Sequence, residues 1–212
     1  MTQKVFWQDP YLTHLDTHIT SVSGDDVTVA ETIFYAFAGG QESDAGTLGG
    51  YVVLQARKDD LEITYTLEPG HDLQPGDRVR MTIDWERRYR LMRLHFAAEL
   101  VLELVYQMFG PIQKIGAHIA QDKARIDFAW GENISGAFPT ILERAHTIIR
   151  ADHPIISAFS DKALEERYWE ITGFARVPCG GTHLRRTGEV GEIELKRKNV
   201  GKGKERIEII VK

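Results

Sequence analysis

Four side chains in two short segments carry the donor atoms that zinc sites use. His95 and Glu99 are four residues apart in an apolar, periodic stretch, so a helix there places both side chains on one face. Cys179 is the first and His183 the last residue of the segment Cys-Gly-Gly-Thr-His, which places a thiol and an imidazole on a glycine-rich turn. Zn²⁺ accepts nitrogen, oxygen and sulfur donors, and a helix pair with a loop pair can close a tetrahedron. Together the two pairs predict a zinc site, whereas each alone is also typical of a helix-stabilising pair or a structural turn.

A long helix is expected to position the first pair. From Arg87 to Phe109 the apolar residues recur at helical spacing. Gly110-Pro111 then ends the pattern, because glycine favours a helix end and proline cannot continue a helix. His95 and Glu99 therefore lie in the middle of this helix.

Shorter elements are expected after the long helix. Pro139 fits the first turn of a second helix that reaches about Arg150. Asp161 is expected to cap a third helix over Lys162–Trp169. The strands predicted after it are Gly173–Val177, Glu192–Lys198 and Glu205–Val211. The second half of the chain is thus predicted to be mixed α+β.

The first part of the chain has short segments rich in β-branched and aromatic residues, separated by turn-forming groups such as Pro75-Gly76-Asp77. Regularly spaced short strands favour a small barrel or a sandwich. The predicted strands are Val27–Tyr35, Tyr51–Ala56, Glu62–Leu67 and Arg78–Asp84. We therefore expect an α+β protein with a small β-barrel-like domain over residues 1–84 and an α+β domain over residues 85–212.

The net charge also differs between these two parts of the chain. Residues 1–84 hold 5 Lys+Arg against 14 Asp+Glu, a net of −9, whereas residues 85–212 hold 21 against 17, a net of +4. A polyanion such as RNA would therefore dock on the second half. The basic residues that crowd together there are Arg87, Arg88, Arg90 and Arg93, and then Lys196, Arg197, Lys198, Lys202, Lys204 and Arg206.

Composition places the chain in a broad class. The 212 residues are 42% hydrophobic and 27% charged, which is ordinary for a globular protein. No apolar run approaches the roughly 20 residues of a membrane span, and no secretory signal is recognised. The single cysteine excludes an internal disulfide and suits a reducing cytosol. We expect a cytoplasmic protein that does not bind a membrane.

The multi-part motifs resemble a known family. Cys179–His183 followed by Thr187-Gly188-Glu189-Val190-Gly191 is similar to the C-terminal signature of the alanyl-tRNA synthetase editing domain. Asp84–Arg88 with Met92–His95 resembles the approach to that domain's first metal motif, and Phe34-Tyr35, Gly39-Gly40-Gln41, Asp44 and Gly46-Thr47-Leu48 resemble the glycine-rich motif of the preceding β domain. The resemblance runs in order through nearly the whole chain. It is closest to the freestanding alanyl-tRNA editing proteins, because 212 residues leave no room for an aminoacylation domain.

This resemblance implies a function. Such proteins hydrolyse the ester that joins serine or glycine to the tRNA for alanine, so the expected partner is the acceptor end of that tRNA, with no nucleotide cofactor. It implies one Zn²⁺ per chain, with His95, Glu99, Cys179 and His183 as metal-binding and catalytic residues. The residues it implies near the substrate are Phe96, Gly39, Gly40, Gln41, Gly180, Gly181 and Thr182.

Two positions depart from the family pattern. The family motif is His-x-x-x-His with a small hydroxyl residue after the first histidine, but Glu99 replaces the second histidine and Phe96 replaces the hydroxyl residue. Glu99 then has three possible meanings: a carboxylate ligand, a general base, or the loss of the metal. The alternatives to editing of tRNA for alanine are a degenerate domain that only binds tRNA or protein, and a hydrolase of a different aminoacyl-tRNA.

Overall fold

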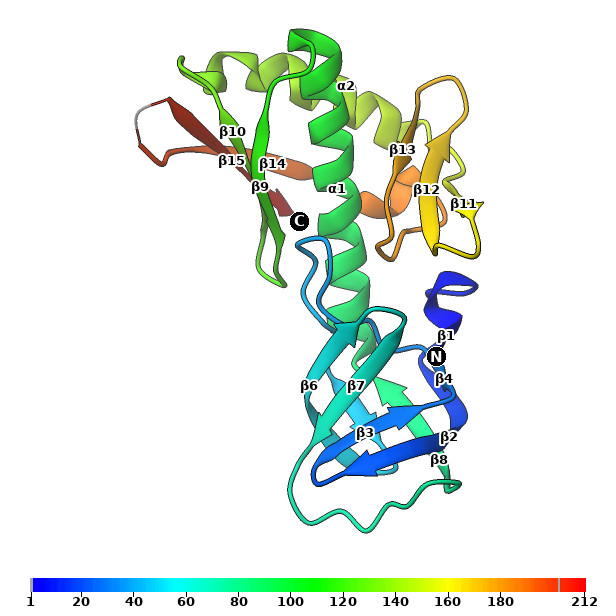
Figure 1. Cartoon of the computed structure of the whole chain (residues 1–212). Coiled ribbons are helices and arrows are strands. Elements are labelled where there is room, and N and C mark those ends of the chain that lie inside the picture. The colour runs from blue at the N-terminus through cyan, green and yellow to red at the C-terminus, as the bar shows by residue number, and fades with distance from the viewer. Residues whose placement is uncertain (1, 202) are drawn as a thin grey trace. The chain divides into compact units, whose positions relative to one another are not determined.

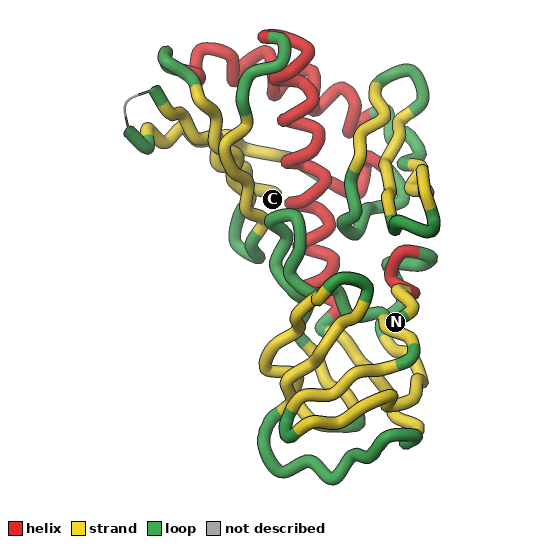
Figure 2. Tube along the Cα trace, in the orientation of Figure 1, coloured by secondary structure: helices red, strands yellow, loops and turns green. Residues whose placement is uncertain are grey.

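The structure, a computed structural model, describes residues 2–201 and 203–212, so Met1 and Lys202 lie outside the described residues. Within these described residues strands predominate, together with two α-helices and short 3-10 turns (Figures 1 and 2). The chain divides into an N-terminal unit, Met1–Ala38 with Glu42–Tyr89, and a C-terminal unit, Gly39–Gln41 with Arg90–Lys212. The predicted mixture of strands and helices is confirmed, and the assignment of residues 1–84 and 85–212 as two domains stays a prediction.

The N-terminal unit is built from strands around an apolar core. Its strands alternate inward apolar and outward polar side chains, as Ile63, Tyr65 and Leu67 do in β7. Six strands pair in the order β2-β3-β7-β6-β5-β8, and β8 also pairs with β2, so the ring of strands closes. The strands of this unit are β1 (Gln3–Lys4), β2 (His14–Ser23), β3 (Asp26–Val29), β4 (Glu31–Thr32), β5 (Gly46–Leu48), β6 (Tyr51–Asp59), β7 (Glu62–Leu67) and β8 (Arg78–Ile83).

Helix α1 (Trp85–Phe109) follows β8. Asp84 begins it, since its carboxylate accepts a hydrogen bond from the Arg87 amide at 3.0 Å. It ends where predicted: Gly110 has φ +76° and donates to the carbonyl of Tyr106 at 2.9 Å. The predicted second helix is also present as α2 (Phe138–Arg150), with Pro139 in its first turn.

Two antiparallel sheets complete the C-terminal unit, and Figure 1 shows α1 between them. The first has the order β14-β15-β10-β9, and its apolar face is buried through residues such as Ile126, Ile207 and Ile209. The second has the order β11-β12-β13. The strands are β9 (Lys114–Ile119), β10 (Ala124–Ala129), β11 (Ile156–Asp161), β12 (Glu166–Ile171), β13 (Ala175–Pro178), β14 (Ile193–Asn199) and β15 (Lys204–Val211).

The third predicted helix, over Lys162–Trp169, is wrong. Asp161 accepts hydrogen bonds from the amides of Ala163 and Leu164, as a cap would, but the chain makes a turn and continues as β12. Strand β12 alternates buried Arg167, Trp169 and Ile171 with more exposed neighbours. This period of two is the strand pattern, and it prevails over the capping signal.

The predicted strand Val27–Tyr35 is also interrupted. The chain pairs with β2 and β7 as β3, and then with β1 as β4. At the break, the amide of Ala30 donates to the His18 carbonyl and the amide of Glu31 donates to the Thr17 hydroxyl. A change of pairing partner, which local pattern does not encode, divides the strand.

Candidate metal centre

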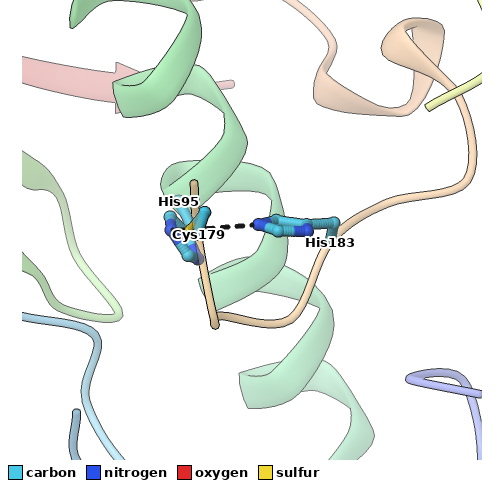
Figure 3. A group of neighbouring side chains, drawn as sticks. All are labelled: His95, Cys179 and His183. Atoms are coloured by element: carbon cyan, nitrogen blue, oxygen red, sulfur yellow. Dashed lines mark hydrogen bonds between the residues drawn. The ribbon is translucent and has the colours of Figure 1, made fainter. Parts of the chain in front are cut away.

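Helix α1 and the loop after β13 bring three donor atoms together. The Cys179 sulfur lies 3.4 Å from Nε2 of His95 and 3.3 Å from Nε2 of His183. Figure 3 shows the three side chains pointing toward one another, one from the helix and two from the loop. The loop is fixed at its start, where the Cys179 amide donates to the Arg167 carbonyl of β12 at 2.8 Å. Among the described residues, these three side chains offer ligand atoms that all lie within 4.8 Å of one another.

These separations fit a zinc ion. With Zn–S near 2.3 Å and Zn–N near 2.0–2.1 Å, tetrahedral ligand atoms stand about 3.5 Å apart. The two sulfur–nitrogen distances therefore match a site of this size. A thiolate with two imidazoles is also a donor set that zinc accepts.

Glu99 lies beside this group, one helical turn from His95. Its Oε1 is 3.5 Å from Nε2 of His95 and 3.7 Å from the Cys179 sulfur, but Glu99 is not a member of the mutually close group. Its other oxygen accepts a hydrogen bond from the Trp169 indole at 3.1 Å. One carboxylate oxygen is thus held by the protein and the other faces the donor atoms.

Each imidazole also has a partner on its far nitrogen. Nδ1 of His95 is 2.6 Å from Oε1 of Gln41, and Nδ1 of His183 is 2.9 Å from the Ser157 hydroxyl. Such contacts hold a ligating ring in place with its other nitrogen directed at the metal. Sequence reasoning did not single out Ser157, and it placed Trp169 in a helix. The alternation within Glu166–Ile171 was the available signal for Trp169.

The charges of the cluster are strongly coupled. Burial opposes a charge on His95, but the negative charges of Cys179 and Glu99 outweigh it and raise the pKa of His95 to about 10. Burial works against the Glu99 carboxylate as well, yet the hydrogen bond and charge of His95 lower the pKa of Glu99 to about 2. Burial and then the charge of His95 lower the pKa of His183 to about 3. The Cys179 and Glu99 side chains therefore favour a positive charge at His95, and that charge in turn disfavours a second one at His183.

The two glycines of the loop have different surroundings. A Cβ on Gly181 would overlap the His95 ring, standing 2.5 Å from Nδ1 and 2.9 Å from Oε1 of Gln41. A Cβ on Gly180, which is exposed, would meet nothing within 4 Å. Of these two glycines, Gly181 is the one whose missing side chain lets the loop approach His95 and Gln41 closely.

The remaining residues predicted to face the substrate have diverse positions. Phe96 is fully buried, with its ring 5.2 Å from that of Trp169 and 6.2 Å from that of His183. Thr182 is buried and bonded to Gln41, whereas Gly39 is exposed. Gly40 has φ +88°, and its carbonyl accepts from the Ile119 amide at 2.8 Å. Contact of these residues with substrate stays a prediction.

Several arginines of the first basic group are engaged within the protein. Arg88 is fully buried, where its guanidinium bonds Asp44 and the carbonyl of Ile33. Arg87 pairs with Glu42 at 2.8 Å, and Arg93 bonds the carbonyl of Val190. These side chains hold the fold together.

The second basic group is divided by the pleat of β14. Arg197 pairs with the buried carboxylate of Glu205, whereas Lys198 lies opposite Arg206 in β15. A cleft of about 320 Å³ opens beside Lys198. Its lining residues are His118, Ala120, Asp122, Lys123, Arg125, Lys198, Arg206 and Glu208.

Among the described residues, no helix has the length and apolar character needed to cross a bilayer.

Comparison with known proteins gives consistent likenesses. Residues 170–208 match the family described as the threonyl and alanyl tRNA synthetase second additional domain. The chain is 30% identical to the alanyl-tRNA editing protein AlaX-M of Pyrococcus horikoshii over 99% of its own length and 97% of that protein. It is 31% identical to AlaX-M of Saccharolobus solfataricus over the full length of both. It is also 30% identical to the alanine–tRNA ligase of Ignicoccus hospitalis, but covers only 24% of that ligase.

Proposed function

Because the chain belongs to the AlaX family of alanyl-tRNA editing proteins, we propose that it is a trans-editing deacylase. Its substrate is the tRNA for alanine wrongly charged with serine or glycine, bound through the acceptor end. The observation that carries the proposal is the His95, Cys179 and His183 group, which supplies a metal-binding centre. The location that suits this role is the cytoplasm, where charged tRNA is used.

His95, Cys179 and His183 would hold one zinc ion per chain. When bound, zinc acts as a Lewis acid that orients an oxygen nucleophile and favours negative charge on the ester carbonyl oxygen. The protein supplies fixed ligand orientations through Gln41 and Ser157. Preorganisation of this kind lowers the cost of rearrangement during the reaction.

Hydrolysis adds water across the ester. The water oxygen bonds to the carbonyl carbon, the bond to the ribose oxygen breaks, and one proton of the water ends on that ribose oxygen. Oε1 of Glu99, which faces the donors while Trp169 holds Oε2, is positioned to carry this proton. As a fourth ligand, Glu99 would instead complete the coordination. The two roles give different results for Glu99 variants.

Phe96 bears on the choice of amino acid. The family places a hydroxyl-bearing residue there, and Phe96 buries a ring against His183 instead. Loss of this hydroxyl is the observation that favours a second candidate, a hydrolase of another aminoacyl ester on the same metal centre. A degenerate domain that only binds tRNA or another protein is the remaining alternative.

A panel of charged tRNAs tests the proposal. Protein purified without chelator is incubated, without ATP, with the tRNA for alanine carrying serine, glycine or alanine and with other aminoacyl-tRNAs. Release of serine or glycine, with alanine spared, supports the proposal. Release from another tRNA selects the second candidate. A folded protein that releases no amino acid from any tRNA would contradict the proposal and favour a domain that only binds tRNA or protein.

A further inference from the structure

Gln41 is a buried amide in a three-residue segment that belongs to the C-terminal unit. The segment lies along the edge of β9: Gln41 forms a parallel bridge with Ile119, and a Cβ on Gly40 would stand 2.7 Å from the Ala117 carbonyl oxygen. The Gly40 carbonyl accepts from the Ile119 amide. The Gln41 side chain therefore starts from a fixed backbone.

The Gln41 amide has one orientation that satisfies its neighbours. The backbone N–H of Thr182 can only donate, and it lies 3.3 Å from the Gln41 atom assigned as Oε1. Nε2 then donates to the Thr182 hydroxyl at 2.9 Å. Thr182 thus identifies the oxygen of the amide.

The orientation of the amide determines the hydrogen bond to His95. Because Oε1 only accepts, Nδ1 of His95, 2.6 Å away, must carry the proton. In a neutral imidazole, Nε2 is then unprotonated, and Nε2 is the nitrogen that faces the Cys179 sulfur. A metal ligand needs this tautomer.

We infer that Gln41 is a positioning residue, which fixes the ring of His95 and its metal-binding tautomer. The inference rests on the proposed metal site, and it gives the glycine-rich segment a role in organising the centre from outside the ligand set. Gly181 completes the arrangement, since the absence of a side chain there lets the loop lie against both His95 and Gln41.

Two variants separate the hydrogen bond from the packing. Gln41→Met keeps the length of the side chain and removes the acceptor. Gln41→Glu keeps an acceptor for Nδ1–H, and the Thr182 hydroxyl can rotate to donate to the new carboxylate. Zinc affinity is measured by competition with a chelator, without tRNA, and Co²⁺ absorption reports the geometry around the sulfur. Circular dichroism and the thermal midpoint verify that each variant is folded.

We expect Gln41→Met to weaken zinc binding about 10- to 100-fold and to alter the Co²⁺ spectrum, and Gln41→Glu to stay close to wild type. Unchanged affinity in a folded Gln41→Met protein overturns the inference while the proposed function stands. If that variant instead keeps its zinc affinity and raises only the KM for mischarged tRNA in the deacylation assay, Gln41 contacts substrate and the inference is wrong. A wild-type protein that binds zinc but deacylates no tRNA refutes the proposed function alone, and one that binds no metal refutes both.

Discussion

Gly181 lies against the imidazole of His95 so closely that the loop has no space for a methyl group at this position. Gly181→Ala would break the contact between Nδ1 of His95 and Gln41 by displacing the His95 ring, or it would displace the loop that carries Cys179 and His183. We expect zinc affinity to fall at least about tenfold, as for loss of an orienting contact. Gly180→Ala is the matched control, because its Cβ meets nothing within 4 Å. Equal zinc affinity of the two folded variants would contradict this geometry.

The metal ligands are predicted to rank by donor type. Cys179→Ala should reduce zinc content more than Glu99→Ala, because thiolate binds zinc more strongly than carboxylate and Glu99 lies outside the mutually close group. Elemental analysis of protein purified without chelator gives the content, with one zinc per chain expected for wild type. A metal-free wild-type protein that also refuses added zinc would exclude the site.

Glu99 variants distinguish a base from a ligand. If Glu99 carries the proton, Glu99→Gln should retain zinc while deacylation slows about 10²- to 10⁴-fold, because an amide cannot accept the proton. If Glu99 is a ligand, Glu99→Gln loses zinc and Glu99→His, which restores a nitrogen donor, recovers it. Zinc content and single-turnover deacylation are measured on the same preparations. Retention of both zinc and full rate in Glu99→Gln would exclude both roles.

The buried pair of Arg88 and Asp44 is expected to stabilise the N-terminal unit. Both side chains are fully buried, so Arg88→Ala leaves an uncompensated carboxylate in the core. We expect a loss of about 3–5 kcal/mol in the free energy of unfolding, measured by urea denaturation. Arg87→Ala, whose pair with Glu42 keeps some contact with solvent, should cost less than Arg88→Ala. Similar losses in the two variants would show that burial does not determine the contribution of these pairs.

The sequence predicted the helix from Arg87 and the donors at its centre, because helical periodicity and glycine–proline stops are local signals. It also singled out Gln41, but not its contact with His95, which joins residues 54 positions apart. That contact depends on the segment lying along β9, and nothing in the local pattern of residues 39–41 specifies it. The failure at Lys162–Trp169 has a different origin: the alternation along Glu166–Ile171 is a local strand signal, and the helix-capping residue Asp161 was given more weight than that alternation.

Binding of tRNA is expected to depend on salt. Lys and Arg that neutralise phosphates release counterions, so affinity should fall as salt rises. The basic groups of the second half of the sequence, which include Arg87 with Arg88 and Lys196 with Arg197 and Lys198, are the candidates for these contacts. The structure narrows the choice: Arg88 is buried with Asp44 and Arg197 is paired with Glu205, so their removal would disturb folding.

Lys196 and Lys198 are the cations of this set that are used for the test, because both are exposed on β14 and the pair that Lys196 makes with Glu194 at 3.4 Å is itself exposed. Lys196→Gln with Lys198→Gln should weaken tRNA binding and flatten the slope of log affinity against log salt by about 1.4–1.8, with zinc content unchanged. Lys58→Gln with Arg78→Gln removes the same charge from the acidic N-terminal unit and should leave the slope near that of wild type. The measurement is a binding titration with uncharged tRNA at several salt concentrations. If the β14 pair has no effect, or the control pair has an equal one, the RNA phosphates are held by another surface, and membership of the editing family is unaffected.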